Sequence, residues 1–254
     1  MFKNPGILLE EEFVHAFDGK KIDDLGYNQK HMLRQMFGIF DPEKTLKAGL
    51  VDGFQKPDIW LEYDGQRKYI SIKSGKAVVV GMENVKKFIR YLREWHLSEE
   101  SQKTILLFHF GDGTVDGSGK ERYDMDLFRA KLKKRIEALN EELNDNPEFV
   151  KEFVERYLFK GTQPNYIPAD YIYFGDVNFG TICSKTQVMK HIERRARENH
   201  WRFLFNPHVG PLLFRPHARY TGKEIKDESK RWEVNIYWAN LFADLSYIAQ
   251  RYDG

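Results

Sequence analysis

The strongest constraint on this chain is a β-hairpin predicted between Lys56 and Lys76, because its turn also fixes which side chains lie opposite one another. Asp64-Gly65 separates two extended stretches, and a two-residue type I′ loop requires positive φ at both positions, which Asp-Gly tolerates. The register follows: Asp58 lies opposite Ser71, Ile59 opposite Ile70, Trp60 opposite Tyr69, and Glu62 opposite Arg67.

The two faces of this hairpin differ in chemistry, because side chains alternate between the faces of a strand. The face expected to join a core carries Ile59, Ile70 and Ile72. Asp58, Ser71 and Lys73 share the other face. A carboxylate, a hydroxyl and an ammonium group at the end of a sheet can hold a divalent cation and polarise a water beside it. This is the chemistry that cutting a phosphodiester needs.

These residues resemble the PD-(D/E)xK superfamily of restriction endonucleases and related DNA-processing nucleases. Pro57-Asp58 matches the "PD", and Ser71-Ile72-Lys73 matches "(D/E)xK" except at its first position. The resemblance implies an α/β fold with a central mixed β-sheet flanked by helices, a restriction endonuclease-like core. It also implies Mg²⁺, for which Mn²⁺ can substitute, bound by Asp58, with Lys73 positioning or activating the attacking water. Ser71 is then a spectator or holds a metal-bound water.

The serine at position 71 leaves the strand without its second metal-binding carboxylate. In members of the superfamily with such a serine, a glutamate on the following helix reaches the same metal, and Glu83 is the candidate here. The alternative is ordinary matching of an acidic side chain to the N-terminus of a helix. Glu62, opposite Arg67, is expected to form a cross-strand ion pair instead.

A run of glutamates, 10 to 12, lies on the first predicted helix. Nucleases of this pattern often place an acidic residue there, pointing into the metal site. The apolar stripe that includes Leu8 and Phe13 favours Glu11 or Glu12 as the inward-pointing ligand over Glu10. A solvated helix face explains at least two of the three glutamates without any metal.

The order of predicted elements indicates a single α/β domain spanning residues 1–254, with 115–168 as a helical insertion or flank. Periodicity predicts helices at 7–17, 28–37, 83–95 and 185–199, two helices within 124–158, a central strand buried on both faces at 104–110, and a further strand at 170–174.

The overall composition excludes several classes of protein. Forty basic and thirty-eight acidic side chains give a net charge of only +2, so any electrostatic signal must be local. The single cysteine, Cys183, permits no intrachain disulfide and no thiolate cluster for zinc, and it fits a reducing compartment. Since no apolar run approaches the length of a membrane span, we expect no membrane association and a cytoplasmic location.

Positive charge is concentrated between residues 185 and 219, where only two glutamates accompany the basic side chains. The predicted DNA-binding residues are Lys185, Lys190, Arg194, Arg195, Arg197, Arg202, Arg215 and Arg219. Such concentration is expected of a surface that faces phosphates, and arginine also suits the major-groove edge of guanine. The alternative is a solvated helix in which Glu193 and Arg197 pair at i, i+4.

These observations predict a Mg²⁺-dependent endonuclease that hydrolyses double-stranded DNA, of the type II restriction kind, acting as a homodimer because two strands must be cut. One rival is a repair or recombination nuclease that recognises DNA structure. Another is a DNA-binding module that kept the fold and lost the chemistry with Ser71. A third is an unrelated domain in which Asp58 and Lys73 form a structural ion pair.

Overall fold

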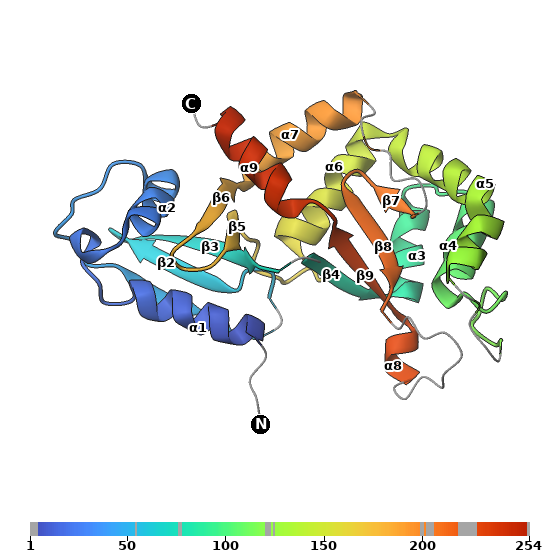
Figure 1. Ribbon diagram of the computed structural model, residues 1–254, viewed down its shortest axis with the longest axis horizontal. Coiled ribbons are helices and arrows are strands. Elements are labelled where there is room, and N and C mark those ends of the chain that lie inside the picture. The colour runs from blue at the N-terminus through green and yellow to red at the C-terminus, as the bar shows by residue number, and fades with distance from the viewer. Residues whose placement is uncertain are drawn as a thin grey trace. The chain divides into compact units, whose positions relative to one another are not determined.

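The computed structural model of the protein describes residues 5–53, 55–75, 78–119, 123, 125–198, 201, 206–217 and 228–252. The chain packs into two compact units, each with its own sheet (Figure 1). Unit 1 comprises residues 1–78, 155–191 and 240–254, and unit 2 comprises 79–154 and 192–239. The predicted α/β class with a mixed sheet and flanking helices is confirmed, whereas the division into two units was not predicted.

Unit 1 is built on a five-stranded mixed sheet in the order β1-β2-β3-β5-β6. The strands are β1 (Lys47–Leu50), β2 (Ile59–Tyr63), β3 (Gln66–Lys73), β5 (Tyr171–Gly175) and β6 (Gly180–Ser184). Strands β1, β2 and β3 form an antiparallel meander, β5 adds to β3 in parallel, and β6 returns antiparallel to β5.

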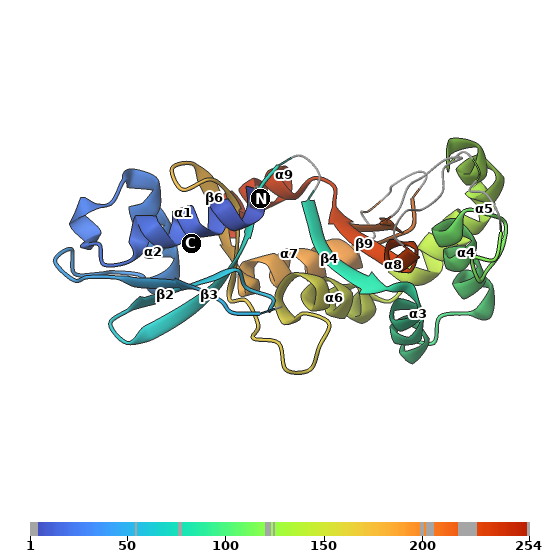
Figure 2. The same ribbon diagram turned by 90° about the horizontal axis from the view of Figure 1, so that it is seen from below.

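The predicted hairpin is confirmed in its turn and its register. Asp64 and Gly65 have φ of 50° and 77°, as a type I′ turn requires. Ile59 pairs with Ile70, and Glu62 pairs with Arg67. The apolar face carrying Ile59, Ile70 and Ile72 is buried in one core with helices α1 (Pro5–Phe17) and α2 (Tyr27–Phe37). Helix α1 runs along β1 and β2 (Figures 1 and 2).

Two further helices belong wholly or partly to unit 1. Helix α7 (Lys185–Arg197), predicted as the basic helix, begins directly after β6 and continues into unit 2. Helix α9 (Leu241–Tyr252) packs against β5 and β6 through Leu245, whose carbonyl accepts from the Cys183 thiol. Two short turns, 22–24 and 156–160, complete the unit.

Unit 2 combines helices with a four-stranded sheet in the order β4-β9-β8-β7. Its strands are β4 (Val78–Asn84), β7 (His208–Val209), β8 (Leu212–Pro216) and β9 (Glu233–Trp238). Its helices are α3 (Val85–Glu94), α4 (Glu99–Phe110), α5 (Met125–Asn144), α6 (Pro147–Glu155) and α8 (Glu228–Arg231). The two helices predicted within 124–158 are confirmed, and the helical part of 115–168 packs in this unit up to residue 154.

The predicted central strand at 104–110 is wrong, because these residues form the second half of α4. Ser98 caps the N-terminus of this helix by accepting a hydrogen bond from the Ser101 amide, and Gly111 ends it in the left-handed conformation with φ of 64°. The apolar run is continuous because α4 packs against α3, α5 and β8. The Gly-rich segment after it therefore follows a helix.

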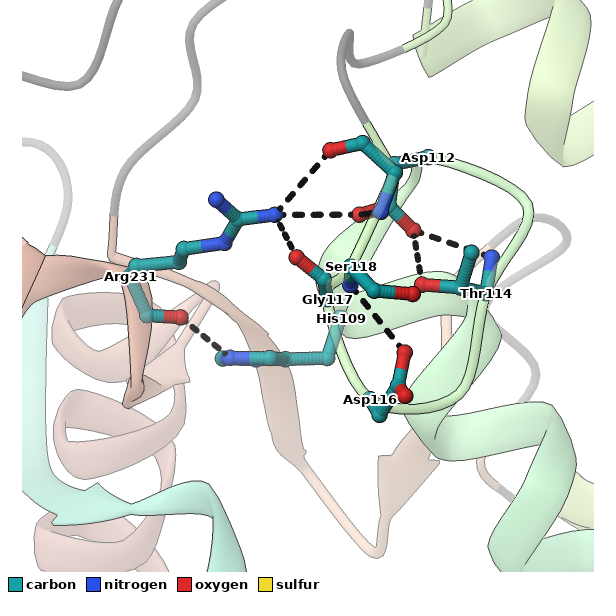
Figure 3. Close-up of polar contacts among 8 residues, drawn as sticks. His109, Asp112, Thr114, Asp116, Gly117, Ser118 and Arg231 are labelled. Carbon is teal, nitrogen blue, oxygen red and sulfur yellow. Dashed lines mark hydrogen bonds and ion pairs between the residues drawn. The ribbon is translucent and has the colours of Figure 1, made fainter.

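That Gly-rich loop is held by Arg231 in unit 2 (Figure 3). The carboxylate of Asp112 is almost fully buried, and it accepts hydrogen bonds from the Thr114 amide, the Thr114 hydroxyl and the Gly119 amide. The Arg231 guanidinium lies 3.1 Å from Asp112 Oδ2 and also donates to the Gly117 carbonyl. The buried negative charge is thereby balanced by one guanidinium group.

None of the helices in the described ranges, which leave gaps such as 202–205 and 218–227, is long and apolar enough to cross a bilayer.

Candidate active site

Asp58 lies directly before β2, where the strands of the meander in unit 1 begin to pair. Its amide donates to the carbonyl of Ile70 at 2.8 Å, and its carbonyl accepts from the Val51 amide at 3.1 Å. Pro57 precedes it, and β2 begins at the next residue. The backbone on both sides of this carboxylate is therefore fixed by the sheet.

Three donors converge on one oxygen of this carboxylate. Asp58 Oδ2 accepts from Ser71 Oγ at 3.2 Å, from the Ile72 amide at 2.5 Å and from Lys73 Nζ at 3.1 Å. No donor in the described part of the chain contacts Oδ1. The side chain is thus held in one orientation, with its second oxygen open to a cation.

Lys73 is tied to the same cluster by two contacts. Its ammonium group lies 3.1 Å from Asp58 Oδ2 and 2.8 Å from the carbonyl of Ile72. The two charged side chains are 17% and 21% exposed, so the pair is partly screened by water and remains accessible to a substrate. The predicted convergence of Asp58, Ser71 and Lys73 is confirmed.

Ser71 is fully buried, and its hydroxyl donates to Asp58. This contact matches a positioning role for the hydroxyl. A buried hydroxyl that already donates to a carboxylate is poorly placed to hold an exchangeable water.

Glu10 is an N-terminal acid whose charge interacts with that of Asp58, whereas the roles of Glu11 and Glu12 as ligands stay predictions. Burial is the largest cause that raises the pKa of Glu10; the negative charge of Asp58 also raises it, Lys73 opposes the shift, and the resulting pKa is about 7. Glu12 is exposed. The reason for the partial burial of Glu10 is the helical period: the fully buried Phe13 and Phe17 stand three and seven residues after Glu10, which puts all three on one face of α1.

Lys56 is a fourth charged group at this end of the sheet, and the sequence analysis did not identify it. Burial of its ammonium group is the largest cause that lowers the pKa of Lys56; the charge of Lys73 also lowers it, Asp58 opposes the shift, and the resulting pKa is about 7. The sequence does contain a signal for Lys56: it stands two residues before Asp58, and side chains at i and i+2 lie on the same face of an extended chain.

The two remaining acidic candidates lie elsewhere. Glu62 accepts from Arg67 at 2.8 Å and from Lys47 at 3.4 Å, which confirms the expected cross-strand ion pair. Glu83 was expected in the first turn of a helix, but it is a buried residue of β4 in unit 2, and helix α3 begins only at Val85. Glu83 is therefore not among the residues of unit 1 that form this cluster, and its role as a ligand stays a prediction.

The donor set around Asp58 suits a hard cation. The carboxylate of Asp58 lies beside Lys73 at the end of β3 and interacts electrostatically with that of Glu10, and Mg²⁺ is commonly bound by one or two carboxylates together with waters and substrate phosphate. Within the described ranges no group of three His, Cys, Asp or Glu side chains gathers closely enough to hold a metal by itself. A site of this kind would be completed by substrate.

The predicted DNA-binding residues are largely engaged with other side chains. Lys185 pairs with Glu155 at 2.6 Å, Arg194 with Glu198 at 3.5 Å, and Arg197 with Glu193 at 2.6 Å. Lys190 lies over Tyr252, and Arg215 over Tyr237. Arg195 is half-buried on α7, and Arg202 and Arg219 lie outside the described residues. The i, i+4 pair of Glu193 and Arg197, which a solvated helix face predicts, is present.

The sequence matches no model of a known protein family and no curated protein. Functional inference therefore depends on the geometry of the chain itself.

Proposed function

We propose that this chain is a Mg²⁺-dependent endonuclease that hydrolyses phosphodiester bonds of double-stranded DNA, in the manner of a type II restriction endonuclease. The observation that carries the proposal is the gathering of Glu10, Asp58 and Lys73 at the end of a β-meander. The order of helix, antiparallel meander and added parallel strand in unit 1 also supports a restriction endonuclease-like core. A cytoplasmic location belongs to the proposal.

In this proposal Asp58 and Glu10 hold the cation. When bound, Mg²⁺ stabilises negative charge on the scissile phosphate and favours ionisation of a water. Lys73 donates hydrogen bonds from a fixed position, so it can orient the attacking water or neutralise charge on a phosphate oxygen. Ser71 and the Ile72 amide keep the Asp58 carboxylate from rotating. With a pKa of about 7, Lys56 is charged in about half of the molecules at neutral pH, and a nearby phosphate favours its charged form.

Cleavage of supercoiled and linear plasmid with Mg²⁺, and separately with Mn²⁺, tests the proposal. We expect discrete fragments from the wild-type protein, and a loss of at least about a hundredfold in rate for Asp58→Ala, Lys73→Ala and Glu10→Gln. Glu62→Gln is the matched control, because it removes a carboxylate of the same hairpin that is already paired with Arg67.

The Glu83→Gln variant decides between the two candidate second ligands. Full activity assigns the second carboxylate to Glu10, whereas a loss equal to that of Asp58→Ala restores the original prediction. Wild-type protein that binds DNA without cutting it under either metal would favour the binding module, and protein that does neither would refute the proposal.

A further inference from the structure

A groove of about 650 Å³ in unit 1 borders the candidate active site. Ser74 and Gly75, which directly follow Lys73, line it, and so do Leu9 and Glu12, which flank Glu10 along α1. The groove is therefore lined by residues that adjoin Lys73 and Glu10 in sequence. Its volume is in the range of sites that bind small organic groups.

The walls of this groove are apolar and aromatic. Phe174 and Phe242 contact each other with ring centroids 5.3 Å apart, and Phe179 stands at the rim with 74% of its surface exposed. Leu8 is a further exposed apolar residue of the wall. Apolar surface of this kind does not bind phosphate, but it matches the face of a flat aromatic ring.

The charges of the groove point to the same occupant. Its described lining contains no Lys or Arg, whereas Glu12 and Asp176 contribute carboxylates. Carboxylates repel a phosphodiester backbone and accept hydrogen bonds from the exocyclic amino groups of bases. A nucleobase fits this combination, and the backbone of an intact duplex does not.

The turn that presents Phe179 is rigidly braced. Asp176 Oδ1 accepts from the amides of Asn178 and Phe179 at 2.8 and 2.9 Å, and the Asp176 carbonyl accepts from the Tyr173 hydroxyl at 2.6 Å. Asn28 in turn donates to that hydroxyl at 3.1 Å. Because these hydrogen bonds already order the backbone that carries Phe179, little backbone entropy is lost when a base stacks on its ring.

From these observations we infer that the groove binds a nucleobase that has left the helical stack of the duplex, so that a single unpaired nucleotide beside the bond to be cut strengthens binding. The inference rests on the proposed function, since it takes the neighbouring carboxylates to be the cleavage site. Base stacking on an aromatic side chain is sequence-tolerant, so this groove contributes affinity for an unstacked base and does not discriminate between bases.

The test measures DNA binding by fluorescence anisotropy in EDTA, where metal-dependent cleavage does not proceed. Two labelled duplexes are compared, one fully paired and one identical except for a single unpaired nucleotide. We expect the wild-type protein to bind the second at least about fivefold more tightly, which corresponds to the lower end of the stacking energy on an aromatic ring.

Phe179→Ala should abolish this preference, because it removes the ring on which the unpaired base stacks. Phe179→Leu, which keeps an apolar side chain without a ring, should abolish it as well and guards against an effect of folding. Tyr27→Ala is the matched control, because Tyr27 is an aromatic side chain of α2 that is 85% exposed and lies outside the groove.

Equal affinity of the wild-type protein for both duplexes would overturn the inference, and so would a preference that survives in Phe179→Ala. The preference without any cleavage in Mg²⁺ would support the groove and refute the nuclease. Cleavage by a protein that shows no preference would support the nuclease and refute the inference about the groove.

Discussion

Asp58 is the residue on which the candidate site depends, because three donors fix one of its oxygens. Two of those donors, the Ile72 amide and the Lys73 ammonium group, follow directly from the register of the hairpin. The third is a serine hydroxyl where the related sequence pattern has an acid. A buried second carboxylate beside Asp58 would have to be desolvated next to a like charge, which is costly.

Ser71→Ala should lower the rate of plasmid cleavage by about tenfold, because a hydrogen bond to a charged group contributes roughly 1.5 kcal/mol. The loss should be smaller than that of Lys73→Ala, since the Ile72 amide and Lys73 still hold Asp58 Oδ2. Single-turnover cleavage at saturating DNA measures it. A loss as complete as that of Asp58→Ala would mean that Ser71 contacts the reacting groups itself.

At the scale of elements, the loop between α4 and α5 shows how a single side chain from a distant segment can stabilise a Gly-rich stretch. Arg231, at the end of α8, reaches Asp112 and the carbonyl of Gly117 (Figure 3). The Arg231 carbonyl also contacts His109 Nε2 of α4 at 2.9 Å. These contacts connect segments that are more than a hundred residues apart in sequence.

Arg231→Met should destabilise unit 2 by about 3 kcal/mol, because it leaves the buried Asp112 carboxylate without its counter-charge. Urea unfolding followed by tryptophan fluorescence measures this, since unit 2 contains Trp95, Trp232 and Trp238. Combining the change with Asp112→Asn should recover part of the loss. A double variant no more stable than Arg231→Met would show that the ion pair is not the cause.

His208, at the start of β7, makes unit 2 sensitive to acid. Burial lowers the pKa of His208 to about 4 from an ordinary value of 6.5. The folded state therefore resists a proton that the unfolded chain accepts, so stability is full above pH 6.5 and declines as the pH falls toward 4. The whole decline amounts to about 3 kcal/mol.

The corresponding prediction concerns the difference between two proteins. The free energy of unfolding of His208→Gln should fall less steeply than that of the wild-type protein between pH 6.5 and 4.5. Urea unfolding at several pH values measures both slopes. Parallel slopes would indicate that His208 is protonated equally in the folded and unfolded states.

At the scale of the molecule, the sequence predicted correctly those turns, pairings and helices that depend on residues close together in the chain. The Asp-Gly turn, the hairpin register, helix α2 and helix α7 follow from short stretches of sequence. The run at 104–110 was misassigned because a buried helix and a buried strand are equally apolar, and the capping signals at Ser98 and Gly111 should have decided it. The second sheet was not predicted, since β4 pairs with β9 from a distant part of the chain, although β7 and β8 are close in sequence.

The residues of the candidate site were likewise predicted where they depend on local sequence, and not where they depend on how distant elements are placed. Asp58, Ser71 and Lys73 depend only on the hairpin, and the structure brings them together. Glu10 depends on how α1 is rotated against the sheet, which the spacing to Phe13 and Phe17 determines. Glu83 was expected in the first turn of a helix, but that helix begins only at Val85.

A homodimer is the simplest way for one such site per chain to cut both strands. Sedimentation velocity should then show a species of twice the chain mass at the concentrations used for cleavage. Supercoiled plasmid should pass to the linear form without accumulation of the nicked circle. A monomer whose main product is the nicked circle would contradict the homodimer.

The parallel pairing of β3 with β5 has a consequence for how the protein is made. The chain leaves unit 1 after β3, forms most of unit 2, and only then supplies β5, about a hundred residues later. The conformational entropy of closing so long a loop is lost before the pairing of β3 with β5 contributes any free energy. Folding is therefore slowed. A ribosome-bound chain ending before β5 has Asp58 and Lys73 but an incomplete sheet, so a potential DNA-cutting site matures late in synthesis.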